Sequence, residues 1–268
     1  MNDNQYLIKA KVIENLPLSP GYHRLAFYAP EIAEVSSPGQ FLLIRGWSGY
    51  DPFLPRPMSI NELHYEKGKP SGVRILFRVV GRGTKLFSLL SPGDEVSLRG
   101  PLGNGFPLLG EGKAMLVAGG IGVSPLLFLA NKLKSAGVDA ELLIGGKGRE
   151  DLLLLSSFEN LGVKVEITTE DGTQGRKGVV TELLEERLSQ GERGTIYACG
   201  PEGMLKEVAR LSLRYGCEAY LSLERRMACG IGACLGCAIP IKREGKREMV
   251  RVCKEGPVFP AGEVIFDE

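Results

Sequence analysis

The stretch AMLVAGGIGVSPLLFLA, residues 114–130, decides the fold that this sequence predicts. It starts as a short apolar strand, turns through Gly119, Gly120 and Gly122, and continues beyond Pro125 as an apolar helix. Glycines in such a turn allow a tight bend and close passage of a ligand backbone, and the helix N-terminus that follows suits a phosphate. The stretch therefore predicts a strand–turn–helix unit that places Gly119, Gly120, Gly122 and Pro125 against a nucleotide.

The residues that follow repeat the alternation of strand and helix. Strands are expected at AELLIGG (140–146), VKVEITTE (163–170) and GTIYACG (194–200), with helical stretches between and after them. This alternation indicates a parallel sheet with βαβ crossovers, so residues 109–220 are predicted to form an α/β NAD-binding domain. The glycine turn has Pro125 where the strict G-x-G-x-x-G pattern has its third glycine, which leaves a plain turn without ligand as the alternative.

A second ligand position is expected where the strand GTIYA ends. Cys199, Gly200 and Pro201 lie at a carboxyl strand end, where open α/β sheets bind their ligands, and Cys199 is a candidate neighbour of the nicotinamide. The alternative for Cys199 is a small buried core residue. Lys147 and Arg149 could meet the 2′-phosphate of NADP or lie in solvent as loop charges, so the choice between NAD and NADP stays open.

Residues 1–108 have a different pattern. Short, partly alternating apolar runs are separated by Pro-Gly pairs at residues 20–21, 38–39 and 92–93. Short strands at this spacing indicate an antiparallel β-barrel, with one short helix expected over residues 84–90. We therefore expect a barrel domain to precede the α/β domain.

Polar and glycine-rich positions in this half fit a flavin nucleotide. A flavin ring needs a backbone edge and a small hydroxyl, for which Ser59 is the candidate, and the pyrophosphate needs a cation and a helix N-terminus. The R-P-x-S tetrapeptide alone is also compatible with an ordinary strand entry, but its position before a Gly-Thr turn and an α/β domain favours FAD. The predicted FAD contacts are Arg56, Pro57, Met58, Ser59, Leu76, Phe77, Arg78, Gly83 and Thr84.

Four of the six cysteines gather near the C-terminus. Cys229, Cys234 and Cys237 give C-x4-C-x2-C in MACGIGACLGC, and Cys253 follows across a predicted hairpin. This is the plant-type [2Fe–2S] spacing, and the intervening glycines allow the loop to wrap closely around a cluster. Zinc is the main alternative, although it is usually held by two C-x2-C knuckles. Residues 221–268 are therefore predicted to form a small cluster-binding module, stabilised by its metal centre.

Composition and charge exclude several classes of function. The net charge of +1 gives no reason to expect nucleic acid or an anionic membrane as partner, and no apolar run reaches the length of a membrane span. The N-terminus shows no signal peptide, so a cytoplasmic location is expected, and the clustered cysteines favour metal over disulfides. The two histidines, His23 and His64, lie outside every motif. No Ser/His/Asp nucleophile system is recognisable, so no catalytic side chain is predicted.

The order of these motifs resembles the ferredoxin–NADP reductase superfamily. The segments MACGIGACLGCAIPI (227–241) and VCKEGPVF (252–259) narrow the resemblance to the electron-transfer subunits of NAD-dependent dihydroorotate dehydrogenases of the B type. The resemblance implies FAD at the positions given above and a [2Fe–2S] cluster on Cys229, Cys234, Cys237 and Cys253. It also implies a complex with a separate FMN-containing catalytic subunit that oxidises dihydroorotate to orotate in pyrimidine synthesis, as a heterotetramer of two plus two subunits.

The three cofactors imply a division of work. A nicotinamide exchanges a hydride, an iron–sulfur cluster exchanges single electrons, and a flavin does both, so FAD is expected to connect the other two. Electrons would then run from the partner's FMN through the cluster and FAD to NAD+, with the cluster segment facing the partner. The alternatives are a subunit that serves ferredoxin or a sulfur-reducing partner, and a zinc-stabilised binding module without flavin.

Overall fold

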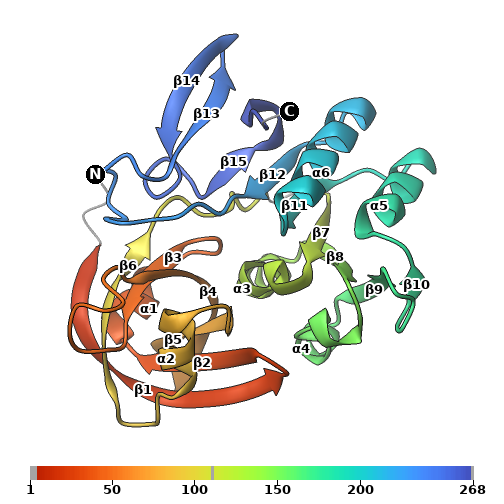
Figure 1. Ribbon diagram of the computed structural model, residues 1–268. Helices are drawn as coiled ribbons and strands as arrows, with labels where there is room; N and C mark the ends of the chain where they lie inside the picture. Colours follow the sequence, from red (N-terminus) through yellow and green to blue (C-terminus); the bar gives the residue numbers. More distant parts are fainter. Residues whose placement is uncertain (1–4, 110–111, 267–268) are drawn as a thin grey trace.

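The computed structural model describes residues 5–109 and 112–266. Figure 1 shows a strand-rich half formed by the first part of the chain, an α/β half beside it, and a hairpin that projects from the body of the molecule. The predicted sequence of an antiparallel barrel, a parallel-sheet domain and a small C-terminal module is confirmed. The predicted domain boundaries at 108/109 and 220/221 stay a proposal. The second of them falls inside a strand of the large sheet, Ala219–Ser222.

The first half is a closed antiparallel barrel. Its strands are β1 (Tyr6–Ser19), β2 (Tyr22–Tyr28), β3 (Phe41–Arg45), β4 (Arg56–Glu66), β5 (Lys69–Arg78) and β6 (Glu95–Leu102), in the order β1-β2-β5-β4-β3-β6. Alternate residues point inward, as the period of a strand requires, and Leu25, Ile60 and Ile75 are fully buried there. Two short helices accompany the barrel, α1 (Pro30–Val35) and α2 (Arg82–Ser88), the second at the expected helix.

The second half is a seven-stranded sheet. It contains β7 (Lys113–Gly119), β8 (Asp139–Gly146), β9 (Lys164–Thr169), β10 (Arg176–Lys177), β11 (Thr195–Cys199), β12 (Ala219–Ser222) and β15 (Val258–Pro260), in the order β10-β9-β8-β7-β11-β12-β15. The first six strands run parallel, whereas β15 pairs antiparallel with β12. The strand order reverses direction at β7 and β11, so the carboxyl ends of these two strands form the crevice in which such sheets bind ligands.

Helices cover both faces of the sheet. The helices are α3 (Val123–Ser135), α4 (Leu155–Asn160), α5 (Val180–Ser189) and α6 (Glu202–Tyr215), with single 3-10 turns η1 (Gly120–Gly122), η2 (Arg149–Asp151) and η3 (Ala261–Glu263). Met115 and Val117 of β7 belong to the core that holds α5 and α6, and Leu116 belongs to the core that holds α3 and α4. The near-continuous apolar run of β7 is therefore explained by burial on both faces.

The cysteine-rich segment is built into both halves. Its hairpin consists of β13 (Ala238–Arg243) and β14 (Lys246–Arg251), and the following chain returns to the large sheet as β15. A side-chain carbon at Gly230 would overlap Leu43 of the barrel, so this glycine lets the loop lie directly on β3. The backbone N–H of Asn104 donates to the carbonyl oxygen of Gly256 at 2.6 Å, which joins the end of β6 to the loop that follows the last cysteine.

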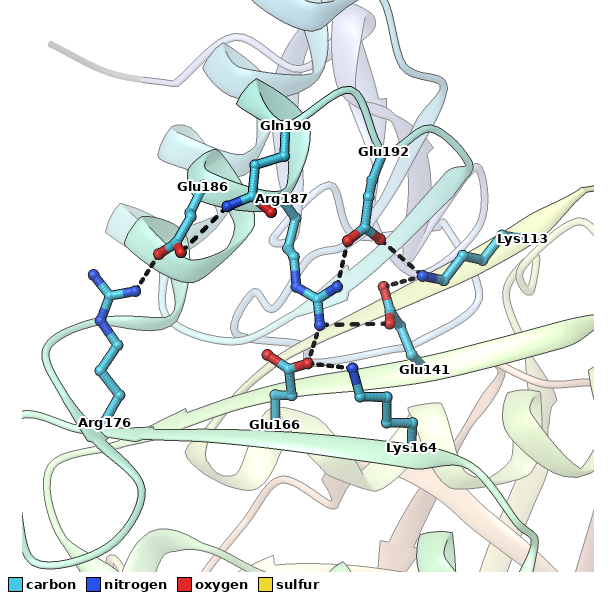
Figure 2. Close-up of polar contacts among 9 residues, drawn as sticks. All are labelled: Lys113, Glu141, Lys164, Glu166, Arg176, Glu186, Arg187, Gln190 and Glu192. Carbon is cyan, nitrogen blue, oxygen red and sulfur yellow. Dashed lines mark hydrogen bonds and ion pairs between the residues drawn. The ribbon is translucent and has the colours of Figure 1, made fainter.

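An ion-pair network closes the amino edge of the parallel sheet, opposite the crevice (Figure 2). Arg187 of α5 contacts three carboxylates, Glu141, Glu166 and Glu192, while Lys113 lies 2.9 Å from Glu141 and 2.8 Å from Glu192. Glu141 is almost fully buried, so its charge is stabilised only by these partners. The network therefore fixes α5 to the beginnings of β7, β8 and β9.

Candidate functional site

Two adjoining cavities open between the barrel and the carboxyl edge of the sheet. Each has a volume of about 310 Å³, and the two share Arg78, Ile121 and Glu224 as walls. One cavity is lined mainly by β4, β5 and the cysteine-rich segment, and we call it the flavin cavity. The other is lined mainly by the glycine turns after β7, β8 and β11, and we call it the nucleotide cavity.

The flavin cavity gathers most of the predicted FAD residues. Pro57, Met58, Ser59, Leu76, Phe77, Arg78 and Thr84 line it, and Pro125 and Cys199, which the sequence assigned to the nucleotide, also lie here. Arg56 and Gly83 lie beside it in mutual contact, because a side-chain carbon at Gly83 would come within 2.7 Å of Arg56 Nε. The Thr84 hydroxyl accepts the N–H groups of Val80 and Gly81, so it closes the first turn of α2.

The residues around this cavity fit a flavin dinucleotide. Leu76, Phe77 and Met58 offer apolar walls for a ring system. Within residues 5–109 and 112–266, neither Arg56 nor Arg78 has a carboxylate at ion-pair distance, and each instead lies over an aromatic ring, Arg56 over Trp47 and Arg78 over Tyr22. Two cations without counter-charges at the edge of an apolar cavity suit the two phosphates of FAD.

Several walls of the flavin cavity were not predicted. Phe41, Ser222, Leu223, Met227 and Pro257 all contribute, and all are separated from the predicted FAD residues by long stretches of chain. No local pattern marks such residues, because only the closing of the tertiary structure brings them together. For Met227 and Pro257 a signal was present in the sequence, because they lie close to Cys229 and Cys253.

The nucleotide cavity contains the predicted glycine turn. Gly119, Gly120 and Gly122 line it together with Gly200 and Pro201. A side chain at Gly122 would overlap the backbone carbonyl of Cys199, so glycine there permits the first turn of α3 to pack against the end of β11. The backbones of the two turns are therefore close enough to form one wall of the cavity.

Charged residues line another part of this cavity, and two of them, Asp151 and Glu170, were not singled out from the sequence. Lys147 lines it beside these two carboxylic residues, whereas the Arg149 side chain donates from Nε to Gln174 Oε1 at 3.4 Å. The Tyr22 hydroxyl, from the barrel, donates to Asp151 Oδ1 at 2.6 Å. Burial and this hydrogen bond raise the pKa of Tyr22 to about 12, so the hydroxyl remains a donor across the physiological range.

Glu224 lines both cavities, and Cys199 lines the flavin cavity next to Gly200, a wall of the nucleotide cavity. Cys199 is buried, as expected for a core residue, and also lines the flavin cavity; its place beside the nicotinamide stays a prediction. Burial raises the pKa of its thiol to about 12, which keeps it neutral. The Glu224 side chain is still reached by solvent, but the surrounding walls replace part of its water and raise the pKa of its carboxyl.

The four C-terminal cysteines are brought together as free thiols. The backbone N–H of Gly232 donates to Cys253 Sγ at 3.2 Å, and that of Cys253 donates to Cys237 Sγ at 3.4 Å. For Cys229 burial acts against ionisation, but the N–H groups of Ile231 and Cys234 outweigh it and lower the pKa of the thiol to about 6. Burial and the neighbouring Cys237 raise the pKa of Cys253 to about 12.

This donor set fits a [2Fe–2S] cluster. Backbone N–H groups that point at sulfur are a usual part of such sites and tune their potential. Among residues 5–109 and 112–266, no three His, Cys, Asp or Glu side chains are arranged as ligands of a single metal ion. Four sulfur donors in the C-x4-C-x2-C…C spacing match the two-iron cluster, in which the ligands are shared between two metal atoms.

The chain joins the cysteine loop to the flavin cavity on both sides. Met227, two residues before Cys229, and Pro257, four residues after Cys253, are walls of that cavity. Cys234 itself is exposed and does not line the flavin cavity. Cluster site, flavin cavity and nucleotide cavity therefore follow one another through the molecule.

Comparisons with known proteins agree with this arrangement. Residues 224–265 match the family model of the iron–sulfur cluster binding domain of dihydroorotate dehydrogenase B, and residues 116–210 match that of the oxidoreductase NAD-binding domain. In the solved structures, the chain is similar to an NADH-dependent reduced ferredoxin–NADP oxidoreductase studied for flavin-based electron bifurcation. The TM-score is 0.83 at 26% identity, over 96% of this chain and 89% of that one. A ferredoxin–NADP+ reductase of Neisseria gonorrhoeae with bound FAD and NADP shares the fold, at a TM-score of 0.63 and 19% identity over 83% and 95% of the two chains.

Two curated relatives are similar over nearly their whole length. The dihydroorotate dehydrogenase B (NAD(+)) electron transfer subunit of Desulforamulus reducens is 39% identical over 96% of this chain and 98% of its own. That of Caldanaerobacter subterraneus subsp. tengcongensis is also 39% identical, over 98% of this chain and 100% of its own. The chain belongs to the family of dihydroorotate dehydrogenase B (NAD(+)) electron transfer subunits.

Proposed function

We propose that this chain carries electrons from the FMN of a separate dihydroorotate-oxidising subunit to NAD+, through a [2Fe–2S] cluster and FAD, in pyrimidine synthesis. The observation that carries the proposal is the unbroken sequence of sites. Met227 and Pro257 connect the cysteine loop to the flavin cavity, and Arg78, Ile121 and Glu224 are common to the flavin and nucleotide cavities. A cytoplasmic location and a heterotetramer of two plus two subunits belong to the same proposal.

The side chains of this protein bind and orient rather than react. FAD, when bound, exchanges a hydride with a nicotinamide and single electrons with an iron–sulfur centre. Ser59, a wall of the flavin cavity, would meet the polar edge of the ring, and Arg56 and Arg78 would meet the pyrophosphate. Cys199, neutral because of its raised pKa, offers a small uncharged surface at the point where the two cavities meet. Glu224 places a carboxyl with a raised pKa at the same junction.

The glycine turns serve the pyridine nucleotide. Gly120 has open space where a side-chain carbon would stand, so a dinucleotide could approach its backbone closely, while Gly119 and Gly200 let the two turns pack against each other and against Met204. Asp151 and Glu170 at the far end of the cavity are carboxylates, which accept hydrogen bonds from ribose hydroxyls and repel a 2′-phosphate. Lys147 is the one positive side chain from the sheet domain in this wall, and it has solvent around it. We therefore assign NAD rather than NADP.

The exposed side of the cysteine loop is the proposed docking face for the catalytic subunit. Cys234 is exposed there, in the same loop as the exposed apolar side chains of Ile231 and Leu235. Exposed apolar side chains around a redox centre are typical of a surface that is covered in a complex. A partner on this face would approach the cluster through the exposed Cys234.

Dihydroorotate-dependent NAD+ reduction tests the proposal, measured on this chain alone and on the complex with its co-purified partner. Turnover only in the complex is expected. Cys234→Ser should abolish NAD-linked turnover and spare reduction of an artificial acceptor by the partner's flavin. Equal loss of both activities would contradict the electron route.

A ferredoxin-linked function is the second candidate, favoured by the similarity to the bifurcating oxidoreductase. Inactivity with dihydroorotate in a complex that retains flavin and cluster, together with NADH-dependent reduction of ferredoxin, would establish it instead. Reduction of a sulfur-linked acceptor under the same conditions would identify the remaining alternative.

A further inference from the structure

The segment from Trp47 to Pro55, between β3 and β4, lies against Arg56, one of the two cations assigned above to the FAD pyrophosphate. It forms no regular strand or helix, and it carries Trp47, the sole tryptophan of the chain. The Trp47 ring is half-buried and packs on Phe87 of α2 at 5.6 Å between ring centroids. Its indole N–H donates to the carbonyl oxygen of Pro52 at 2.6 Å, which holds the segment folded back on itself.

Arg56 is enclosed on two sides. Its guanidinium carbon lies 5.5 Å from the centroid of the Trp47 ring, and the guanidinium also lies against Gly83, where a side-chain carbon would approach Nε to 2.7 Å. Arg56 Nη1 donates to the carbonyl oxygen of Leu54 at 2.5 Å. The ring, the glycine and the carbonyl restrict the orientation of the guanidinium, and its remaining N–H groups are available to a ligand.

The charge of Arg56 has no compensation within the described residues 5–109 and 112–266. The nearest acidic side chain of the segment, Asp51, is paired instead with Arg82 at 2.6 Å, which ties the segment to the first residue of α2. An arginine that is held in place without a counter-ion is preorganised for an anionic group, because its side-chain entropy is lost before the ligand arrives.

We propose that Trp47 is a positioning residue for FAD, acting through Arg56. By stacking on the guanidinium and fixing the Trp47–Pro55 segment, it aims Arg56 at the pyrophosphate. The inference rests on FAD as the cofactor but not on the electron acceptor, since it concerns only binding of FAD to this chain. This role also explains why a tryptophan occurs in this irregular segment. Packing alone could be provided there by any apolar residue.

The test is FAD binding to deflavinated protein that retains its cluster. Trp47→Ala should weaken FAD about 5- to 30-fold, the range expected for loss of a cation–π contact and of the order it imposes. Trp47→Phe keeps a ring face but loses the hydrogen bond to Pro52, and should restore most of the affinity. Tyr65→Ala, an exposed aromatic at the far end of β4, is the matched control and should leave FAD affinity unchanged.

Two further measurements separate positioning from a merely structural role. In a double-mutant cycle, Trp47→Ala should have no additional effect once Arg56 is replaced by Ala, because the two residues act as a unit. Riboflavin, which lacks the phosphates, should bind wild type and Trp47→Ala equally. Additive losses in the cycle, or equal losses for riboflavin and FAD, would overturn the proposal. Because no turnover is measured, its failure is distinguishable from failure of the electron-transfer function.

Discussion

The two edges of the parallel sheet are built on opposite principles. At the carboxyl edge, Gly119, Gly122 and Gly200 let the turns after β7 and β11 pack together as one wall of the nucleotide cavity. At the amino edge, Arg187 and Lys113 hold three carboxylates in a closed network (Figure 2). The comparison indicates that the same strands bind ligands at one end and anchor helix α5 at the other, so changes at the two ends should affect different measurements.

The largest effect is expected from Arg187→Met at the amino edge. This change leaves the buried Glu141 and the carboxylates of Glu166 and Glu192 without their common cation, and loss of one partner from a buried charge cluster costs about 3 kcal/mol of stability or more. Denaturant unfolding measures the loss. NAD+ affinity should stay within about twofold of wild type. A parallel fall in NAD+ affinity would show that the two edges are not independent.

Gly122→Ala tests the opposite edge. The added carbon would overlap the Cys199 carbonyl, so the first turn of α3 must move away from β11. Such overpacking costs about 1–3 kcal/mol of folding stability. We expect NAD+ affinity, measured by titration, to fall about tenfold. Gly203→Ala on α6 is the matched control, since a side-chain carbon there has no neighbour within 4 Å. Unchanged NAD+ affinity in Gly122→Ala would remove the turn from the nucleotide site.

The amino edge should also respond to pH through Glu192. A hydrogen bond from Lys113 holds the pKa of this carboxyl below its usual range, and burial opposes the shift only in part. Because the pKa is lower in the folded state, the ionised carboxyl stabilises the protein above the unfolded-state pKa of about 4.3. This stabilisation is lost as the pH falls from there through the folded-state pKa. Glu192→Gln should therefore cost about 1 kcal/mol at pH 7 and have progressively less effect below about pH 4.3. An effect that is constant with pH would contradict this assignment.

The smallest effect is expected from Lys164→Ala. Lys164 contacts Glu166 at 2.7 Å, but 63% of its side chain is exposed. An ion pair in this setting contributes below about 0.5 kcal/mol, and less at high salt. Unfolding in low and high salt would measure it. A loss approaching that of Arg187→Met would mean that the network acts as one unit rather than through its buried members.

Local patterns predicted the parts of this protein whose chemistry lies in one short stretch. The strand, glycine turn and helix at 114–130 could be predicted because apolar runs and glycines specify such a unit locally. The cysteine loop was recognisable because the distances between ligands in a cluster limit their spacing along the chain. The barrel followed from short strands at regular intervals.

The remaining features depend on contacts between distant segments. Tyr22 meets Asp151 only because the barrel and the sheet pack together, and Pro257 reaches the flavin cavity only after the chain has passed the cluster loop. The edge strand β15 is three residues long, too short to show a pattern of its own. Trp47 stands in a segment with no periodicity, so its place beside Arg56 could not be predicted from neighbouring residues.

The edge strand β15 has a consequence for synthesis of the chain. It is made after Cys253 and completes the sheet by covering β12, so the sheet keeps an open edge until the cysteine-bearing segment has been translated. An open strand edge is a template for pairing with other chains. The cluster module is therefore no detachable unit, and a chain that ends before residue 258 would present an uncovered β12 edge, prone to aggregation.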